Sequence, residues 1–345
     1  MSRFVLGVDG GASSTRALIG TTDGELLGFG RAGPSNHLQG EAGRRRLRNA
    51  LTGSITAALQ QSGVDPAAID ACWLGMTGTW GDPDDHALII RITRELVGCP
   101  NIAVGGDVHA ALVGASVGQP GVIVYAGTGS IAYALDRDGN AHRTGGWGYL
   151  IDDEGGAYHT GRAALTAVFR AADGRAPATR LEALLQHHLE VTTLDAVRRR
   201  VYVEDGMDRP AIAGMARLVA TAAREGDAVA VAILAHAAHH LADLVSTTLR
   251  KLPAAEAGET GETGQAGEAG RHSVFIAGGL FDAGAPLLDA FEADVRRAYP
   301  DAEIRRPAFP PIVGSFITAL EMCTGPLTEA QRIRLGQAVA RMGIT

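Results

Sequence analysis

Residues 121–158 read GVIVYAGTGSIAYALDRDGNAHRTGGWGYLIDDEGGAY, the most densely patterned stretch of the chain. Two short apolar segments, 122–126 and 131–135, flank the turn Gly127-Thr128-Gly129-Ser130. Short apolar runs bounded by glycine and serine are typical of strands, and such turn residues are typical of hairpins. A helical pattern follows from residue 156 onward. The stretch therefore predicts a β-hairpin that opens an α/β unit.

The same order of elements occurs earlier in the chain. Three strand-like segments come first, and the sequence DGGASST at 9–15 separates the first two. Helix and strand patterns then alternate, as they do in the second half. The segments concerned are 4–8, 16–20, 26–31, 41–62, 71–76, 86–97 and 101–105. A strand-rich opening followed by alternating helices and strands, found twice, predicts an α/β protein with two halves facing a cleft.

The length of 345 residues also favours two domains, because one hydrophobic core is usually smaller. We expect an N-terminal domain over 1–112, a C-terminal domain over 113–325 and a C-terminal helix over 326–345. Residues 254–270, AAEAGETGETGQAGEAG, contain no large apolar side chain. Such a segment cannot offset its ordering entropy by burial, so we expect a disordered surface loop there.

Composition excludes several classes of protein. The net charge of −7 argues against a nucleic-acid surface, which needs a basic face. The N-terminal apolar run is too short for a signal peptide, and no later run reaches about 18 apolar residues, so neither export nor a membrane span is expected. The cysteines, Cys72, Cys99 and Cys323, lie far apart, as in a protein of the reducing cytoplasm. Lys251 is the only lysine, so a Walker-type phosphate loop is excluded.

The turn at 9–15 carries groups that suit a nucleotide phosphate without a lysine. Gly10 and Gly11 let backbone N–H groups approach a ligand, and Ser13 and Thr15 add hydroxyl donors. Asp9 can hold a hydrated Mg²⁺ ion. A plain hairpin turn explains this motif equally well when it is taken alone.

Two further glycine turns strengthen the phosphate interpretation. Residues 127–130 repeat the glycine and hydroxyl pattern at the opening of the second α/β unit, so the pair can hold a polyphosphate chain from two sides. Gly278-Gly279 follows the predicted strand 273–277 and suits close contact with a flat nucleotide base.

The order of two phosphate turns and an adenosine turn resembles the actin/Hsp70/hexokinase superfamily. Within it, the sequence is similar to the group of eukaryotic-type N-acetylglucosamine kinases and BadF/BadG/BcrA/BcrD ATPases, over roughly residues 4–320. The GTGS hairpin, the GGWG turn at 145–148 and the Asp153-Glu154-Gly155 turn carry the most specific likeness. The resemblance implies two actin-like (ribonuclease H-like) domains facing an ATP- and sugar-binding cleft. We expect a homodimer, although the sequence leaves the oligomeric state open.

The resemblance also implies roles for individual residues. Asp107 matches a catalytic aspartate that accepts a sugar hydroxyl proton, although an aspartate here also suits a helix N-cap. Asn36 matches a sugar-binding asparagine, or is an ordinary turn residue. The other sugar-contacting positions are Thr128, Gly129, Gly146, Trp147, Gly148 and Asp153, together with Asp107. The ATP-binding positions are Gly10, Gly11, Ser13, Ser14, Thr15, Gly127, Thr128, Gly129, Ser130, Gly278 and Gly279, with Asp9 binding Mg²⁺ through water.

The sequence departs from the family pattern in two places and lacks one metal motif. Ala12 replaces a third glycine, which requires a turn with negative φ, and Ser14 replaces a common lysine. His236 and His240 share one face of a predicted helix without an HExxH glutamate, so we expect no metal site there. The zinc cluster of the ROK sugar kinases has no counterpart, because no cysteine occurs between Cys99 and Cys323.

The glycine turns and the family resemblance together predict an ATP- and Mg²⁺-dependent kinase in the cytoplasm, and the resemblance implies that it converts N-acetylglucosamine to its 6-phosphate. Glucosamine and N-acetylmuramic acid remain open as substrates. The alternative is an ATPase that activates a 2-hydroxyacyl-CoA dehydratase through an iron–sulfur cluster between subunits. That activity needs cysteines near the second phosphate turn, where this sequence has none. A sugar sensor without catalytic activity would need a DNA-binding module, for which the two domains leave no sequence.

Overall fold

The computed structural model describes residues 3–36, 38, 40–79, 82–136, 138–203, 206–253 and 272–344. The chain forms two compact units, Met1–Pro120 with Pro307–Thr345 and Gly121–Arg306. These units differ from the expected division, because position 112 falls inside helix α3 (Asp107–Ser116) and residues 307–325 pack with the first unit. The loop expected at 254–270 lies outside the described residues.

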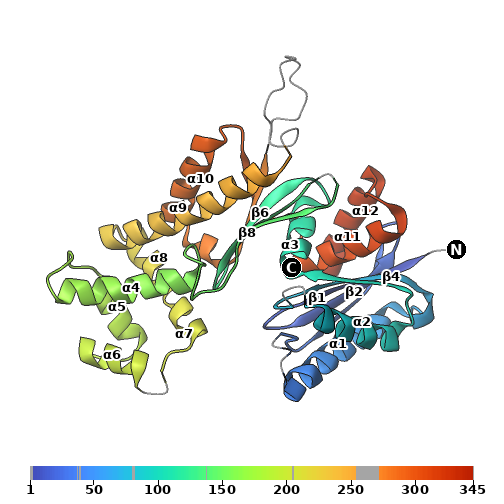
Figure 1. Ribbon diagram of the computed structural model, residues 1–345, viewed down its shortest axis with the longest axis horizontal. Coiled ribbons are helices and arrows are strands. Elements are labelled where there is room, and N and C mark those ends of the chain that lie inside the picture. The colour runs from blue at the N-terminus through green and yellow to red at the C-terminus, as the bar shows by residue number, and fades with distance from the viewer. Residues whose placement is uncertain are drawn as a thin grey trace, which may run out of the picture. The chain divides into compact units, whose positions relative to one another are not determined.

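The first unit is built on a five-stranded mixed sheet in the order β3-β2-β1-β4-β5 (Figure 1). Its strands are β1 (Phe4–Gly10), β2 (Thr15–Thr21), β3 (Leu26–Ala32), β4 (Ile69–Met76) and β5 (Asn101–Gly106). β1, β2 and β3 form an antiparallel meander, whereas β4 and β5 run parallel to β1. The carboxyl ends of β1, β4 and β5 therefore meet at one edge of the sheet, which is where ligands bind in α/β proteins.

Helices cover both faces of this sheet, with α1 and α2 on one face and α11 and α12 on the other (Figure 1). α1 buries Leu47, Leu51 and Ile55, which recur at helical spacing. α11 rests directly on β1, since a Cβ atom added to Gly7 would lie 2.3 Å from the Phe316 backbone nitrogen. The helical elements are α1 (Gly40–Ser62), η1 (Pro66–Ala68), α2 (Pro83–Val97), α3, α11 (Pro311–Thr324) and α12 (Glu329–Met342).

The second unit repeats the sheet topology, in the order β10-β9-β6-β7-β8. Its strands are β6 (Gly121–Ala126), β7 (Ser130–Leu135), β8 (Ala141–Gly145), β9 (Ser273–Ala277) and β10 (Glu303–Arg305). β6, β7 and β8 form an antiparallel meander, and β9 and β10 run parallel to β6. Two sheets of identical topology confirm the predicted α/β fold with two actin-like domains.

The helices of the second unit contribute most of its core. They are α4 (Ala157–Ala172), α5 (Leu181–His188), α6 (Leu194–Tyr202), α7 (Arg209–Gly214), α8 (Ala216–Arg224), α9 (Ala228–Lys251), η3 (Gly279–Ala283) and α10 (Ala285–Ala298). Among the described helices, α9 alone has the length and apolar composition to cross a membrane. Its Leu234, Leu241 and Val245 are buried in the core of this unit, which accounts for the apolar composition.

Candidate functional site

The first group of predicted site residues lies at the carboxyl ends of β1, β4 and β5. The strand register pairs Gly10 with Met76, and Met76 with Gly106. The residues that follow these strands, Thr77 and Asp107, are therefore neighbours, with Asp9 and Gly10 on the other side of Thr77. The Thr77 backbone N–H donates to the Gly10 carbonyl at 2.9 Å and closes this edge.

Asp107 is held by two hydrogen bonds. The Thr77 hydroxyl donates to Asp107 Oδ2 at 2.5 Å, and the Val108 backbone N–H donates to Oδ1 at 2.9 Å. Gly106 is the N-cap of α3, so Asp107 is the first helical residue and not the N-cap itself. Donors to both oxygens fix the orientation of the carboxylate, as positioning a general base requires.

Asp9 is a partly buried carboxylate whose environment favours a cation. Burial raises the pKa of Asp9 to about 6; Arg16 acts in the opposite direction, and the negative charge of Asp107 raises it further. An ion between or beside these two carboxylates would relieve both the burial cost and the repulsion. Oxygen ligands of this kind suit Mg²⁺, which usually keeps several waters, so the residues present fit the predicted metal.

The turn at 9–15, the predicted first phosphate turn, is a tight connection between β1 and β2. The Gly11 N–H donates to the Ser14 carbonyl at 3.0 Å, and Ala12 does not have positive φ, as the alanine was expected to require. Ser13 is exposed and Ser14 is half-buried, whereas Thr15 is fully buried in this structure. The accessible hydroxyls of this turn are therefore those of the two serines.

Asn36 lies next to the first phosphate turn. The Ser35 N–H donates to the Gly11 carbonyl at 3.2 Å, which attaches the segment to the turn. Arg46, on α1, donates from two guanidinium nitrogens to the Asn36 backbone carbonyl, each at 3.2 Å. The backbone at Asn36 is thus held in place from two directions, and the first unit brings Asn36 and the phosphate turn together.

In the second unit, the turn at 127–130 packs on the start of α4. The Gly127 N–H donates to the Gly129 carbonyl at 2.9 Å, and Ala157 and Tyr158 donate to the carbonyls of Gly127 and Thr128. The first turn of α4 thereby satisfies N–H groups that have no partner inside the helix. The hairpin and the helix form one rigid element.

Asp153 fills the space beneath this hairpin. It is only 3% exposed, has φ of +74°, and accepts the Ser130 N–H at 3.3 Å through Oδ1. Arg209 Nη2 lies 3.3 Å from the other carboxylate oxygen. Burial raises the pKa of Asp153, and the Ser130 N–H and the Arg209 charge partly oppose that effect.

The GGWG turn projects from β8. Gly145, Gly146 and Gly148 all have positive φ, a conformation that glycine adopts without strain. Trp147 is 62% exposed, and its backbone N–H donates to Asp152 Oδ2 at 3.2 Å. The Arg143 guanidinium lies 4.2 Å from the centre of the tryptophan ring, in cation–π geometry. Trp147 is thus a surface residue available to a ligand, and not part of the core.

The predicted adenosine turn, Gly278-Gly279, follows β9, beside the end of β6. Gly278 has φ of +97°, and a Cβ atom there would lie 2.4 Å from the carbonyl carbon and oxygen of Ala126. Only glycine permits this contact between the two parallel strands. The second unit therefore brings Gly278 close to the strand that leads into the second phosphate turn.

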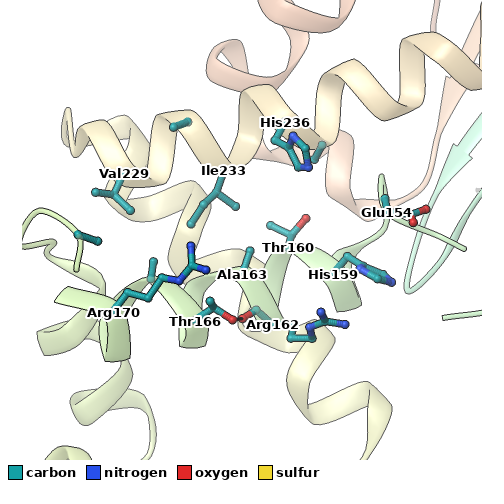
Figure 2. Close-up of a pocket in the computed structure, with 14 residues that line it drawn as sticks. Glu154, His159, Thr160, Arg162, Ala163, Thr166, Arg170, Val229, Ile233 and His236 are labelled. Atoms are coloured by element: carbon teal, nitrogen blue, oxygen red, sulfur yellow. Dashed lines mark hydrogen bonds between the residues drawn. The ribbon is translucent and has the colours of Figure 1, made fainter. Parts of the chain in front are cut away.

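The structure also contains a cavity of about 470 Å³ between α4 and α9 (Figure 2). Glu154 and His159 lie at one end and Arg170 and Val229 at the other, with Ala163 and Ile233 between them. None of the predicted site residues lines this cavity.

A protein-family comparison identifies the chain. The model of the BadF/BadG/BcrA/BcrD ATPase family matches residues 6–319. The chain belongs to this family. The match spans both units and every predicted site residue, which confirms the predicted family relationship.

Named relatives and solved structures agree with this placement. The chain is 29% identical over 239 residues, 69% of its length, to a Clostridium acetobutylicum N-acetylmuramic acid/N-acetylglucosamine kinase, of which 77% is covered. It is 26% identical to an N-acetyl-D-glucosamine kinase of Dictyostelium discoideum, over 91% of this chain and 97% of that one. The structure of a candidate N-acetylglucosamine kinase from Chromobacterium violaceum superposes with a TM-score of 0.69 at 26% identity, over 92% of this chain and 99% of that one.

Two residues of the site escaped the sequence analysis. Thr77 and Arg209 contact the carboxylates of Asp107 and Asp153, respectively. The position of Thr77 directly after the predicted strand 71–76 was the only signal that could have suggested it. No local sequence pattern points to Arg209, because 56 residues separate it from Asp153 in the chain.

Proposed function

We propose that this protein transfers the γ-phosphoryl group of ATP to a hydroxyl of an amino sugar, with O6 of N-acetylglucosamine as the preferred acceptor. The observation that carries the proposal is the Asp107 carboxylate, held by Thr77 and the Val108 N–H at the carboxyl end of β5. The related chains that act on amino sugars, by their names, support the substrate class. Cytoplasmic location and a homodimer are part of the same proposal.

Each group of predicted site residues has its own role in the proposed phosphoryl transfer. Asp107 accepts the proton of the attacking sugar hydroxyl and orients its oxygen. Backbone N–H groups and hydroxyls of the turns at 9–15 and 127–130 bind the phosphate oxygens, where such reactions gain most of their rate. Asp9 would hold Mg²⁺ through water, and the ion would neutralise phosphate charge. Asn36, Asp153 and residues 146–148 bind the sugar.

The cysteines do not support the alternative role as a dehydratase activator. Cys72 and Cys99 are buried in the first unit, and Cys323 is half-buried. A cluster shared between subunits needs accessible thiolates, and none of the three cysteines is exposed. Iron analysis of the purified protein distinguishes the two functions, because an activator would contain iron and a kinase would not require it.

The direct test is a screen of amino sugars with ATP and Mg²⁺, with ADP release as the measurement. We expect release with N-acetylglucosamine and very little with water alone. ADP release that no sugar stimulates would contradict the kinase proposal.

Asp107→Asn tests the assigned base. The variant should fold and bind sugar normally but lose about 10²–10⁴-fold in kcat, the usual contribution of acid–base catalysis. Asp301→Asn, on an exposed turn, is the matched control and should keep wild-type kcat. A near-normal kcat for Asp107→Asn would remove this residue from the mechanism.

A further inference from the structure

Arg209 reaches the candidate site from a part of the second unit that the sequence analysis did not connect to it. It is the first residue of α7, whose N-cap Asp208 accepts the Ala211 N–H at 2.8 Å. α7 packs tightly on α4, because a Cβ atom on Gly161 would lie 2.0 Å from the Ile212 carbonyl oxygen. The backbone that carries Arg209 is therefore fixed relative to α4.

The guanidinium of Arg209 lies between an aromatic ring and a carboxylate. Its central carbon is 4.9 Å from the centre of the Tyr149 ring, and Nη2 is 3.3 Å from Asp153 Oδ2. The Tyr149 carbonyl in turn lies 3.1 Å from His159 Nε2 on α4. Stacking and pairing together restrict the guanidinium to one orientation.

Asp153 connects Arg209 to the hairpin at 127–130. Its Oδ1 accepts the Ser130 N–H, and Gly129 packs so closely that an added Cβ atom would lie 2.3 Å from Oδ2. A carboxylate that is only 3% exposed needs a charged partner to remain ionised. The charged groups that act on it are Arg209 from α7, His159 from α4 and Asp152 from the preceding turn. Arg209 is the one that pairs with it directly.

We propose that Arg209 is a positioning residue that keeps Asp153 ionised and oriented toward the sugar. The inference rests on the proposed function, since the contact of Asp153 with the sugar is part of it. An ionised Asp153 accepts hydrogen bonds from sugar hydroxyls, whereas a protonated one has a donor in that place. Arg209 therefore sets the lowest pH at which the sugar binds well.

The test is the pH dependence of sugar use by Arg209→Met and Arg209→Lys. Loss of the positive charge raises the pKa of Asp153 further, so the acid limb of kcat/KM should move up by about one pH unit in Arg209→Met. KM for the sugar should rise by up to about tenfold at pH values below the acid limb and much less well above it, with kcat nearly unchanged. Arg209→Lys keeps the charge and should retain a nearly wild-type acid limb.

Arg198→Met is the matched control, because it removes an exposed arginine–aspartate pair on α6 of the same unit. It should leave the profile unchanged. A purely structural role for Arg209 predicts an equal loss at every pH and no rescue by lysine. That result, in variants with unchanged melting temperature, would overturn the inference.

A second measurement does not need activity. The melting temperature is measured as a function of pH for two pairs of proteins. The first pair is wild type and Asp153→Asn, and the second is Arg209→Met and the double variant Arg209→Met/Asp153→Asn. The difference within each pair reports the titration of Asp153, with and without Arg209. Asparagine is tolerated at positive φ, so Asp153→Asn should fold. A higher titration midpoint without Arg209 supports the electrostatic role, even if no amino sugar is phosphorylated and the proposed function fails. An unchanged midpoint contradicts it.

Discussion

At the scale of single residues, two carboxylates carry the candidate chemistry of the first unit. Asp107 is oriented by donors to both oxygens, whereas Asp9 is partly buried and repelled by Asp107. The two environments suit different roles, one for a base whose orientation is fixed and one for a ligand whose charge a cation stabilises.

The raised pKa of Asp9 predicts a pH-dependent effect on stability. Its folded pKa of about 6 exceeds the ordinary value of 3.8, so its contribution to stability is full below pH 3.8 and is lost as the pH rises through about 6. Asp9→Asn removes this loss. At pH 8 the free energy of unfolding of the variant should exceed that of wild type by about 2 kcal/mol, and its melting temperature should be higher. Both differences should shrink toward pH 4.

Thermal melts at both pH values measure this effect, with the exposed Asp23→Asn variant as the control. The same variant should gain less melting temperature than wild type on addition of ATP with Mg²⁺, because it lacks the carboxylate for the ion. Equal stability of wild type and Asp9→Asn at pH 8 would mean that the Asp9 carboxylate is not destabilised by its surroundings.

Thr77→Val tests whether the orientation of Asp107 matters. Valine keeps the shape of threonine but removes the hydroxyl that donates to Asp107 Oδ2. Hydrogen bonds to charged groups contribute about 1.5–3 kcal/mol, so kcat should fall about tenfold or more. Thr77→Ser should restore most of it. If the valine variant kept full kcat, the backbone N–H of Val108 would suffice to orient the base.

At the scale of elements, the hairpin at 127–130 is held by its fit against α4 and Asp153. A Cβ atom added to Gly156 would lie 2.7 Å from Gly129 Cα, and one added to Gly129 would lie 2.3 Å from Asp153 Oδ2. The glycines are thus required by close packing and not by turn conformation. A side chain at either position must displace backbone or a buried carboxylate.

Gly129→Ala is therefore expected to be costly. Displacement of the hairpin from Asp153 should lower kcat/KM at least about 100-fold and destabilise the unit by about 1–3 kcal/mol, as overpacking does. Gly336→Ala on α12 is the control, because its Cβ would make an ordinary 3.8 Å contact with Phe309. That substitution should be neutral or slightly stabilising. A fully active Gly129→Ala protein would mean that the hairpin relaxes freely.

At the scale of the whole molecule, substrate choice follows from the groups around the sugar. If Asp153 and residues 146–148 hold the 3-hydroxyl, that hydroxyl must be free. A 3-O-lactyl group would add bulk and a carboxylate next to existing carboxylates, and would leave polar groups unpaired at about 1–3 kcal/mol each. We expect kcat/KM for N-acetylglucosamine to exceed that for N-acetylmuramic acid at least ~100-fold.

Arg143 is the residue that could allow N-acetylmuramic acid to be used as well as N-acetylglucosamine. Its guanidinium stacks on Trp147, so a positive charge lies beside the predicted sugar turn. Comparable kcat/KM values for the two sugars would mean that this arginine receives the lactyl carboxylate. Arg143→Met would then reduce the use of N-acetylmuramic acid selectively, and the kinase proposal would stand.

The sequence by itself predicted the fold class, which the structure confirms, and it located two glycine turns between strands and an aspartate directly after β5, whose roles stay predictions. Strand periodicity, glycine turns and the order of motifs are local in the chain, so they can be read without coordinates. The predicted helix 41–62 appears as α1, and the negative φ expected at Ala12 is observed.

Only the tertiary structure decided which residues hold the site in place. Thr77 meets Asp107 through the parallel register of β4 and β5, and Arg209 meets Asp153 across 56 residues. The return of residues 307–345 to the first unit, against the expected boundary, depends on the packing of α11 on α3 and β1. Each of these is a contact between distant segments, and local periodicity contains no information about such contacts.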